Sequence, residues 1–232
     1  FNFSTLRHKV FGFTLAEVLI TLGIIGVVAA LTMPTLIANK KASELQTALK
    51  KNASVLGQAV LMVAQEDGVD PTPYSLGSRE LKRKLMKHMK VLKDCGSGTE
   101  ISACVVNSNY VPDAAKTYRT YNNKSDISMG LLDDGQFILT DGAMILIENS
   151  NVAFEQIFIT VDINGFQKGP NRWGHDLFTF DVTKSGKFLP MGAEGTHYEG
   201  DEYCSTTSSS NLNGISCTYK ALSDKDYFKK LP

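Results

Sequence analysis

The stretch that decides the fold is GFTLAEVLI at residues 12–20, which opens a long apolar run. From Val18 to Ala38 the chain has 21 residues without a charge, rich in Leu, Ile, Val and Ala. At about 1.5 Å per residue, a helix of that length crosses a hydrocarbon core of about 30 Å. Basic residues flank the run at positions 7–9 and 40–41. The pattern predicts one membrane-spanning helix.

Two common kinds of apolar segment explain the run only in part. A secretory signal peptide has an apolar region of about 7–15 residues that ends in a small-x-small cleavage site. This run is longer, and no Ala-x-Ala follows it. A plain signal anchor explains the length but not Glu17, because a carboxylate in a membrane is costly and marks a functional site.

The segment resembles the cleavage and methylation segment of type IV pilins and type II secretion pseudopilins. In that family a basic leader ends in Gly, a membrane peptidase cuts after it and methylates the new N-terminus, and a Glu stands five residues into the mature chain. The resemblance assigns these places to Gly12, Phe13 and Glu17. It also implies a Pro within the first helix, and Pro34 stands there.

The resemblance implies an α+β, pilin-like fold, in which a long N-terminal helix packs on a small antiparallel β-sheet head. We expect a leader at residues 1–12, a helix over 13–66 whose first part, 13–38, spans the membrane, and an extracytoplasmic head over 67–232. Apolar residues recur at helical spacing from Leu45 to Val63, which extends the helix beyond the span.

A physical role for Glu17 follows from the cleavage. Cutting before Phe13 creates an α-amino group in apolar surroundings. If Glu17 of a neighbouring subunit pairs with that amine, each buried charge gains a partner, and association relieves both desolvation costs. We therefore expect Glu17 to act in assembly.

Composition excludes several classes of protein. With 43% apolar and 21% charged residues the chain is not disordered, and its formal net charge is zero. Charge is nonetheless uneven, because residues 126–202 carry 4 Lys/Arg and 13 Asp/Glu, whereas residues 79–93 carry seven Lys/Arg and one Glu. Two interpretations remain open: solvated surfaces, or like subunits that stack a basic patch on an acidic one.

The head is predicted to be mostly β-structure. Ser78 is the expected cap of a short basic helix that ends near Leu92. Strands are expected at 131–132 and 136–140, joined as a hairpin by Asp133-Asp134-Gly135, and then at 143–148, 154–162, 177–182 and 187–189. The tail from Met191 is rich in Ser, Thr, Asn and Gly and is expected to be mostly loop.

Four cysteines occur, all in the predicted head. Outside the cytoplasm disulfides persist, and two local bridges, Cys95–Cys104 and Cys204–Cys217, are the simplest pairing. The second bridge closes a loop near the C-terminus, as in many type IV pilins.

A loop after the predicted strand 154–162 is a candidate cation site. Asp and Asn oxygens at alternating positions before a Gly often hold hard cations. The resemblance to pseudopilins adds weight, since major pseudopilins carry a calcium site in a loop of the head. The candidates are Asp162, Asn164 and Asp176, with the carbonyl of Gly165 as a weaker one. The alternative is a turn held by Asx hydrogen bonds, with Trp173 packing it on the sheet.

No catalytic constellation is evident in the sequence. The pair Asp133-Asp134 precedes a Gly and is interpreted as turn chemistry, and G-x-S-x-G and the upstream Gly of a P-loop are missing. The resemblance described above implies a structural subunit of a type IV pilus-like or type II secretion pseudopilus filament, and we expect it to be non-enzymatic.

The partners expected from the resemblance are like subunits, the prepilin peptidase, an inner-membrane assembly platform and the lipid bilayer. We expect an inner-membrane precursor with its head outside, and then a periplasmic or surface filament. The alternatives are an anchored extracytoplasmic binding module and a DNA-uptake pilin. Nucleic acid is a less favoured partner, and the DNA-uptake alternative predicts salt-sensitive binding at Lys82, Arg83, Lys84 and Lys87.

Overall fold

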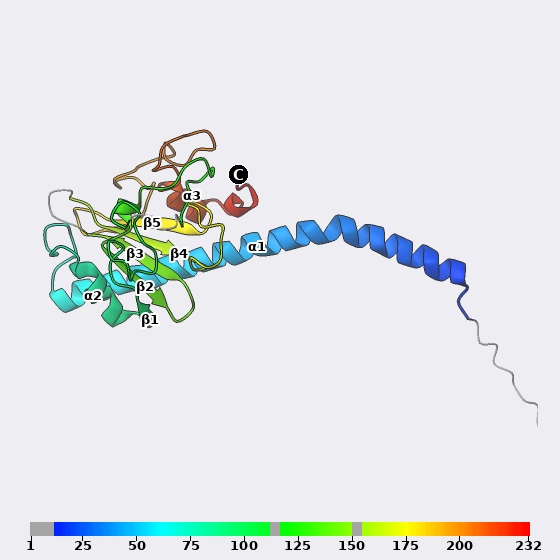
Figure 1. Ribbon diagram of the computed structural model, residues 1–232, viewed down its shortest axis with the longest axis horizontal. Helices are drawn as coiled ribbons and strands as arrows, with labels where there is room; N and C mark the ends of the chain where they lie inside the picture. The colour runs from blue at the N-terminus through cyan, green and yellow to red at the C-terminus, as the bar shows by residue number, and fades with distance from the viewer. Residues whose placement is uncertain (1–11, 112–116, 150–154) are drawn as a thin grey trace, which may run out of the picture. The chain divides into compact units, whose positions relative to one another are not determined.

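The computed structural model describes residues 12–111, 117–149 and 155–232. The chain divides into two compact units, residues 1–41 and 42–232. One α-helix, α1 (Leu15–Asp67), belongs to both and continues through Pro34 (Figure 1). It begins and ends close to the bounds predicted from the apolar run and from the amphipathic stretch that follows.

The second unit combines the later part of α1 with a six-stranded sheet and short helices. The architecture is α+β and pilin-like. In chain order the elements are α2 (Glu80–His88), β1 (Val91–Asp94), η1 (Met129–Leu131), β2 (Gly135–Leu139), β3 (Met144–Glu148), β4 (Phe158–Asp162), β5 (Leu177–Val182), β6 (Phe188–Pro190), α3 (Cys217–Ser223) and η3 (Tyr227–Lys229).

All six strands form one antiparallel meander in the order β1-β2-β3-β4-β5-β6. The turn Asp141-Gly142 joins β2 to β3, as predicted, with Gly142 at φ 92°. In the middle of the sheet Leu146 lies opposite Thr160, which lies opposite Thr179. Because alternate residues face opposite sides, this register separates two sets of side chains.

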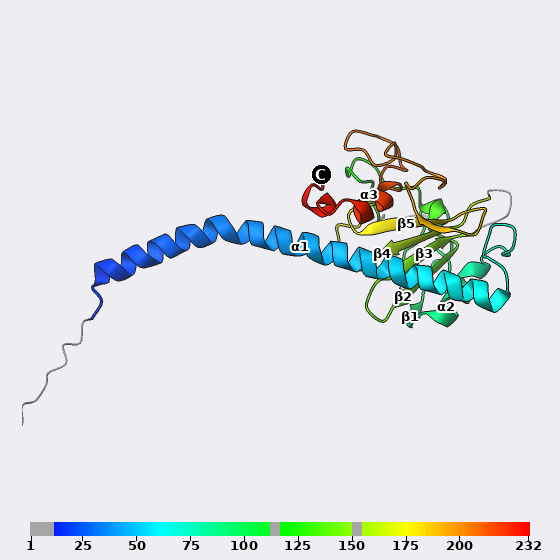
Figure 2. The same cartoon turned by 180° about the vertical axis from the view of Figure 1, so that it is seen from behind.

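One face of the sheet packs on α1, and both views show the helix running along it (Figures 1 and 2). The helix buries Leu49, Leu56 and Val63 completely. The strands supply the facing side chains, among them Phe137, Ile145, Ile159, Val161, Phe178 and Phe180. Burial of such side chains stabilises the fold by about 1.5–3 kcal/mol each.

The opposite face is covered by the long loops and the C-terminal segment. Phe158, Leu177 and Trp173 belong to this second core, and Trp173 donates from Nε1 to Thr179 Oγ1 at 3.1 Å. The prediction that Trp173 packs its loop on the sheet is therefore confirmed. Polar side chains also line this face, with Asp162 near one end of the sheet and Asp181 near the other.

Three predictions for the head were wrong. The basic helix begins after Arg79, not Ser78, and ends at His88, because the next residues form β1 and pair Val91 with Leu139. No strand occupies 131–132: η1 lies there, and β2 pairs with β1 and β3. β4 begins at Phe158, later than the strand predicted from 154. The tail contains α3 and η3 and is otherwise without helix or strand, so the prediction that it is mostly loop is confirmed. Phe154, where a strand was predicted to start, lies outside the described residues.

Both predicted disulfides are present, Cys95–Cys104 and Cys204–Cys217. Cys217 is fully buried at the start of α3, next to Thr218, whose Oγ1 accepts a hydrogen bond from the backbone N of Thr179 at 2.9 Å. The bridge therefore joins the Ser-rich tail to a helix that is bonded directly to β5.

We predict that the double change Cys204→Ser and Cys217→Ser lowers the free energy of unfolding of the head by about 2–5 kcal/mol. The loss should be local to the tail, so hydrogen exchange should accelerate at the amides of α3 before those of β3. Chemical denaturation and hydrogen-exchange mass spectrometry measure the two effects. An unchanged denaturation midpoint would show that the bridge does not order the tail.

Candidate processing and assembly segment and polar sites of the head

The candidate cleavage site lies just ahead of α1. Residues 12–14 are exposed and not helical, and the helix begins at Leu15. A Cβ built on Gly12 meets no atom within 4 Å. The peptide bond between Gly12 and Phe13 therefore lies in an exposed, non-helical segment that a peptidase can reach.

Glu17 closes a capping box with Thr14, a residue that the sequence reasoning missed. Thr14 Oγ1 accepts from the backbone N of Glu17 at 3.2 Å, and Glu17 Oε2 accepts from the backbone N and from Oγ1 of Thr14, both at 2.8 Å. Thr-x-x-Glu before an apolar run is the sequence signature of this box. Glu17 is thus hydrogen-bonded within its own chain, and the box fixes the start of the helix.

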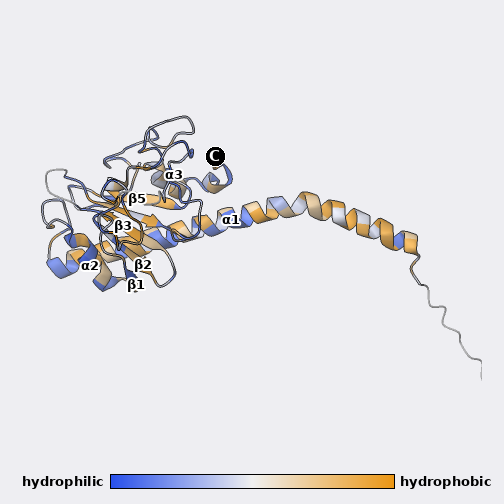
Figure 3. Cartoon of the chain, in the orientation of Figure 1, coloured by the Kyte–Doolittle hydropathy of each residue, from blue (hydrophilic) through white to orange (hydrophobic). Residues whose placement is uncertain are grey.

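The apolar part of α1 is covered by nothing else in the described residues. By length and composition it is the one described helix able to cross a membrane, and none of its apolar window is buried. Figure 3 shows hydrophobic colour along this part of the ribbon. Large apolar side chains more than half exposed include Leu19, Ile20, Leu22, Ile24, Ile25, Val27, Leu31 and Leu36. Such a surface requires lipid or other protein around it.

The predicted cation loop brings its three candidate residues together. Asp162 Oδ1 accepts from the backbone N of Asn164 and Gly165 at 3.3 and 2.8 Å, and Asp162 Oδ2 accepts from the hydroxyl of Tyr118 at 2.9 Å. Asp176 accepts from the backbone N of Asn171 and of Arg172, both at 2.8 Å. These bonds are those of the Asx-turn alternative, and they hold both carboxylates in place.

Two further oxygens of this loop are buried without a hydrogen-bond donor: Asn164 Oδ1 and Asn171 Oδ1. Burial, together with the nearby charge of Asp176, raises the pKa of Asp162 to about 7. Burial also raises the pKa of Asp176. Asp162, Asp176, Asn164 and Asn171 thus offer oxygen ligands within one loop, and oxygen is the ligand that a hard cation such as calcium takes.

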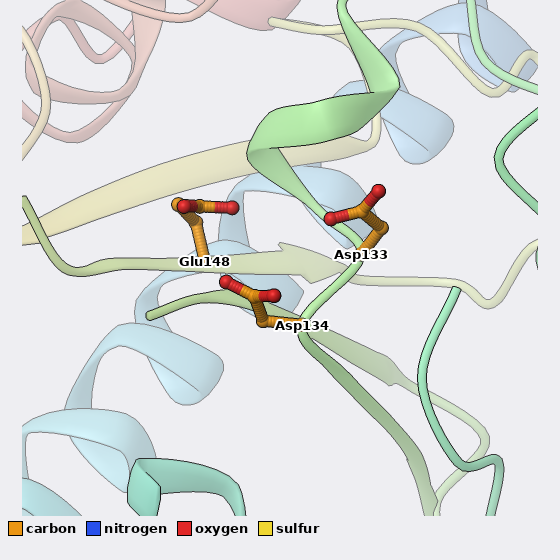
Figure 4. A group of neighbouring side chains, drawn as sticks. All are labelled: Asp133, Asp134 and Glu148. Atoms are coloured by element: carbon orange, nitrogen blue, oxygen red, sulfur yellow. The ribbon is translucent and has the colours of Figure 1, made fainter. Parts of the chain in front are cut away.

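Asp133 and Asp134 are not in an exposed turn. Both are buried between η1 and β2, and their carboxylate oxygens lie within 4.8 Å of those of buried Glu148 (Figure 4). Asn107 Nδ2 donates to Asp133 at 2.6 Å, while Arg79 Nε and the backbone N of Asn149 donate to Asp134 at 2.9 and 2.8 Å. Burial raises the pKa of Asp133. The cluster ties α2 to the sheet.

The basic helix α2 is largely neutralised by carboxylates of the same unit. Lys84 pairs with Asp67 at 2.7 Å, and Glu66 pairs with both Lys87 and His88. Within the helix Glu80 pairs with Arg83 and Lys84, and Lys82 pairs with Asp94, while Arg79 just before the helix pairs with Asp134. This arrangement favours the interpretation of the basic run as a packed, solvated helix over that of a patch for nucleic acid.

Comparison with known proteins finds a known family motif in the N-terminal segment. Residues 7–33 match the family model described as the prokaryotic N-terminal methylation motif. This motif is the signal of type IV pilins and pseudopilins, and the chain carries it over the residues that include Gly12, Phe13 and Glu17. No curated protein and no solved structure matches the chain.

We predict that the stability of the head falls as pH rises from about 4 to about 7. The folded pKa of Asp162, about 7, exceeds its ordinary value near 3.9, so the folded state holds a proton that the unfolded state has lost. In chelator, Asp162→Asn should remove up to about 4 kcal/mol of the change in the free energy of unfolding between pH 4 and pH 7. Chemical denaturation at pH 4, 5.5 and 7 gives the free energy of unfolding of wild type and of Asp162→Asn. An equal dependence of that free energy on pH in the two proteins would contradict the raised pKa of Asp162.

Proposed function

We propose that the chain is a structural subunit of a pilus-like or secretion pseudopilus filament, cut by a prepilin peptidase and polymerised through α1. The motif at residues 7–33 supports a pilin-like or pseudopilin subunit. The observation that carries the finer proposal is that this motif leads directly into a helix whose apolar part is uncovered. Lipid covers that part before assembly, and neighbouring subunits cover it afterwards.

The capping box supplies a starting state for assembly. While the subunit is in the membrane, Thr14 gives the Glu17 carboxylate two donors, which lowers the cost of keeping it in an apolar layer. After cleavage, the α-amino group of Phe13 on a neighbouring subunit is a donor that also carries a positive charge, so pairing adds Coulomb attraction to the hydrogen bond. The Glu17 carboxylate is therefore stabilised when it leaves the donors of Thr14 and pairs with the Phe13 amine of a neighbouring subunit.

The proposed route takes the subunit from the inner membrane to a filament outside the cytoplasm. All four cysteines are paired, which fits an oxidising compartment for the head. The motif implies a prepilin peptidase and other pilin subunits as partners, and we add an inner-membrane assembly platform. A binding module that α1 merely anchors is the alternative, and it predicts no dependence of filament yield on Glu17.

We predict that Glu17→Ala reduces the yield of sheared filaments at least tenfold, with Glu17→Gln intermediate, because Ala leaves the neighbour's amine unpaired. Membrane insertion, cleavage and head stability should match wild type, since Glu17 lies far along the chain from the head. The measurement is filament-bound protein divided by total membrane protein, with the variant as the sole copy. Mass spectrometry should find methylated Phe13 at the N-terminus.

Glu44→Ala is the matched control, because it removes a carboxylate from an exposed position of the same helix outside the span. It should assemble at wild-type yield. If Glu17→Ala also assembles at wild-type yield, or if filament-bound protein keeps its leader, the proposed route is wrong.

We further propose that the loop from Asp162 to Asp176 binds calcium. The observation in favour is the pair of donor-free amide oxygens, Asn164 Oδ1 and Asn171 Oδ1, in the same loop as two buried carboxylates, Asp162 and Asp176. Asp162, Asn164 and Asp176 would hold the ion. Its charge would offset the repulsion between the two carboxylates and fasten the loop to the end of β4.

We predict that chelator lowers the melting temperature of the head by about 5–10 °C relative to calcium at a hundredfold excess over its dissociation constant. Asp162→Ala should abolish this difference. Asp201→Ala, which removes an exposed carboxylate instead, should keep it. Superimposable wild-type melting curves in calcium and in chelator would leave the loop as an Asx turn only.

A further inference from the structure

A buried carboxylate in β5 has no part in the assembly segment or in the calcium loop. Asp181 lies between Phe158 of β4 and Leu189 of β6, on the sheet face opposite α1, and its side chain is only 1% exposed. A carboxylate taken out of water loses its hydration and requires donors or a cation in return. Its partners therefore indicate what the surroundings are built to accept.

Only one oxygen of Asp181 is supplied with donors. Asp181 Oδ2 accepts from the backbone N of His197 at 2.8 Å and from His197 Nδ1 at 3.2 Å. Asp181 Oδ1 is buried and accepts no hydrogen bond. Lys184 lies on the next turn but pairs with Glu155, which also accepts from the hydroxyl of Tyr74 at 2.6 Å. Among the described residues, no Lys or Arg forms an ion pair with Asp181.

Asp181 lines a groove of about 380 Å³. The groove lies between the turn that follows β5 and the loop 191–200, and its walls include Thr183, Lys184, Ser185, Thr196 and His197. The ring of His197 packs edge-on against Phe158 at 5.4 Å and keeps 29% of its side chain exposed. The carboxylate forms the floor of the groove, and the imidazole forms one wall.

Apart from the Lys184 ammonium, which pairs with Glu155, the polar side chains that line this groove offer acceptors. When neutral His197 donates from Nδ1 to Asp181, its Nε2 is left as an acceptor. Thr183 Oγ1 and Ser185 Oγ bond to each other at 3.0 Å and keep lone pairs to offer. A ligand with several donors, no acceptor and a positive charge complements this set, and an anion would be repelled by Asp181.

A primary ammonium fits this description better than a metal ion does. It carries three donors on a compact charge, at the end of a stem that can lie along threonine methyl groups and the Lys184 chain. A metal ion needs more ligands than this groove offers, because its lining has one carboxylate, Asp181, and one imidazole, His197. We propose that the Asp181 groove binds a primary alkylammonium group.

The probe for this proposal is n-butylammonium, titrated at pH 7.5 into the full chain in detergent with 15N-labelled histidines. The ring signals of His197 should shift saturably, while those of His88 and His175 stay unchanged. n-Butanol, which has the same stem without charge, should cause no saturable shift. Asp181→Asn should weaken butylammonium binding at least tenfold, because the charge at the floor is lost.

Two further variants keep the test decisive if Asp181→Asn folds poorly. Ser185→Trp fills the groove from an exposed turn position and should also weaken binding at least tenfold. Asp201→Asn removes a carboxylate that is 69% exposed, at the surface beside Lys220, and should leave binding unchanged. A titration without saturation, equal effects of n-butanol, or wild-type binding by Ser185→Trp would overturn the proposal.

The same assay distinguishes two sources of the ammonium group. Tighter binding of Nα-acetyl-lysine N-methylamide than of 1,4-diaminobutane assigns the groove to a lysine side chain of a partner protein. The reverse order assigns it to a free diamine. Both orders support an ammonium site, and neither depends on filament assembly, so this proposal stands or falls separately from the proposed function.

Discussion

The first part of α1 presents apolar side chains on every side, and this surface is incompatible with water. The rest of the structure follows from that constraint. A helix of this kind is stable only in lipid or among other helices, so its backbone must be satisfied internally and its one carboxylate needs a partner. The capping box of Thr14 and Glu17 meets both requirements at the exposed start of the helix.

The later part of the same helix packs on the sheet of the head. It is amphipathic, and it buries one face against the sheet while its charged residues stay outside. The sheet then has a second face, which carries Asp162, Thr160 and Asp181 as well as apolar residues. Long loops cover this face and supply its polar groups with donors, as when Tyr118 bonds to Asp162 and His197 to Asp181. The loops are therefore structural parts of the core.

Local signals predicted the long helix, the turn at Asp141-Gly142 and the strand 177–182, because periodicity and turn chemistry act within a few residues. They failed where distant contacts decide. Val91 and Leu92 continue a helical pattern but belong to β1, which pairs with β2. Asp133 and Asp134 resemble a surface turn but are buried beside Glu148. The acceptor role of Asp181 depends on His197, sixteen residues away, and no local pattern indicates it. The capping role of Thr14, in contrast, is predictable from the sequence, because Thr-x-x-Glu before an apolar run is the signature of a capping box.

Both edges of the sheet are poorly suited to pairing with another chain. β1 has four residues and an irregularity between Val91 and Lys93, and β6 has three residues and ends in Pro190, which has no backbone N–H to donate. A membrane holds many copies of a subunit at high local concentration, where open edges would join neighbouring sheets into aggregates. Blunted edges discourage that competing contact, which is compatible with the proposed association of subunits through α1.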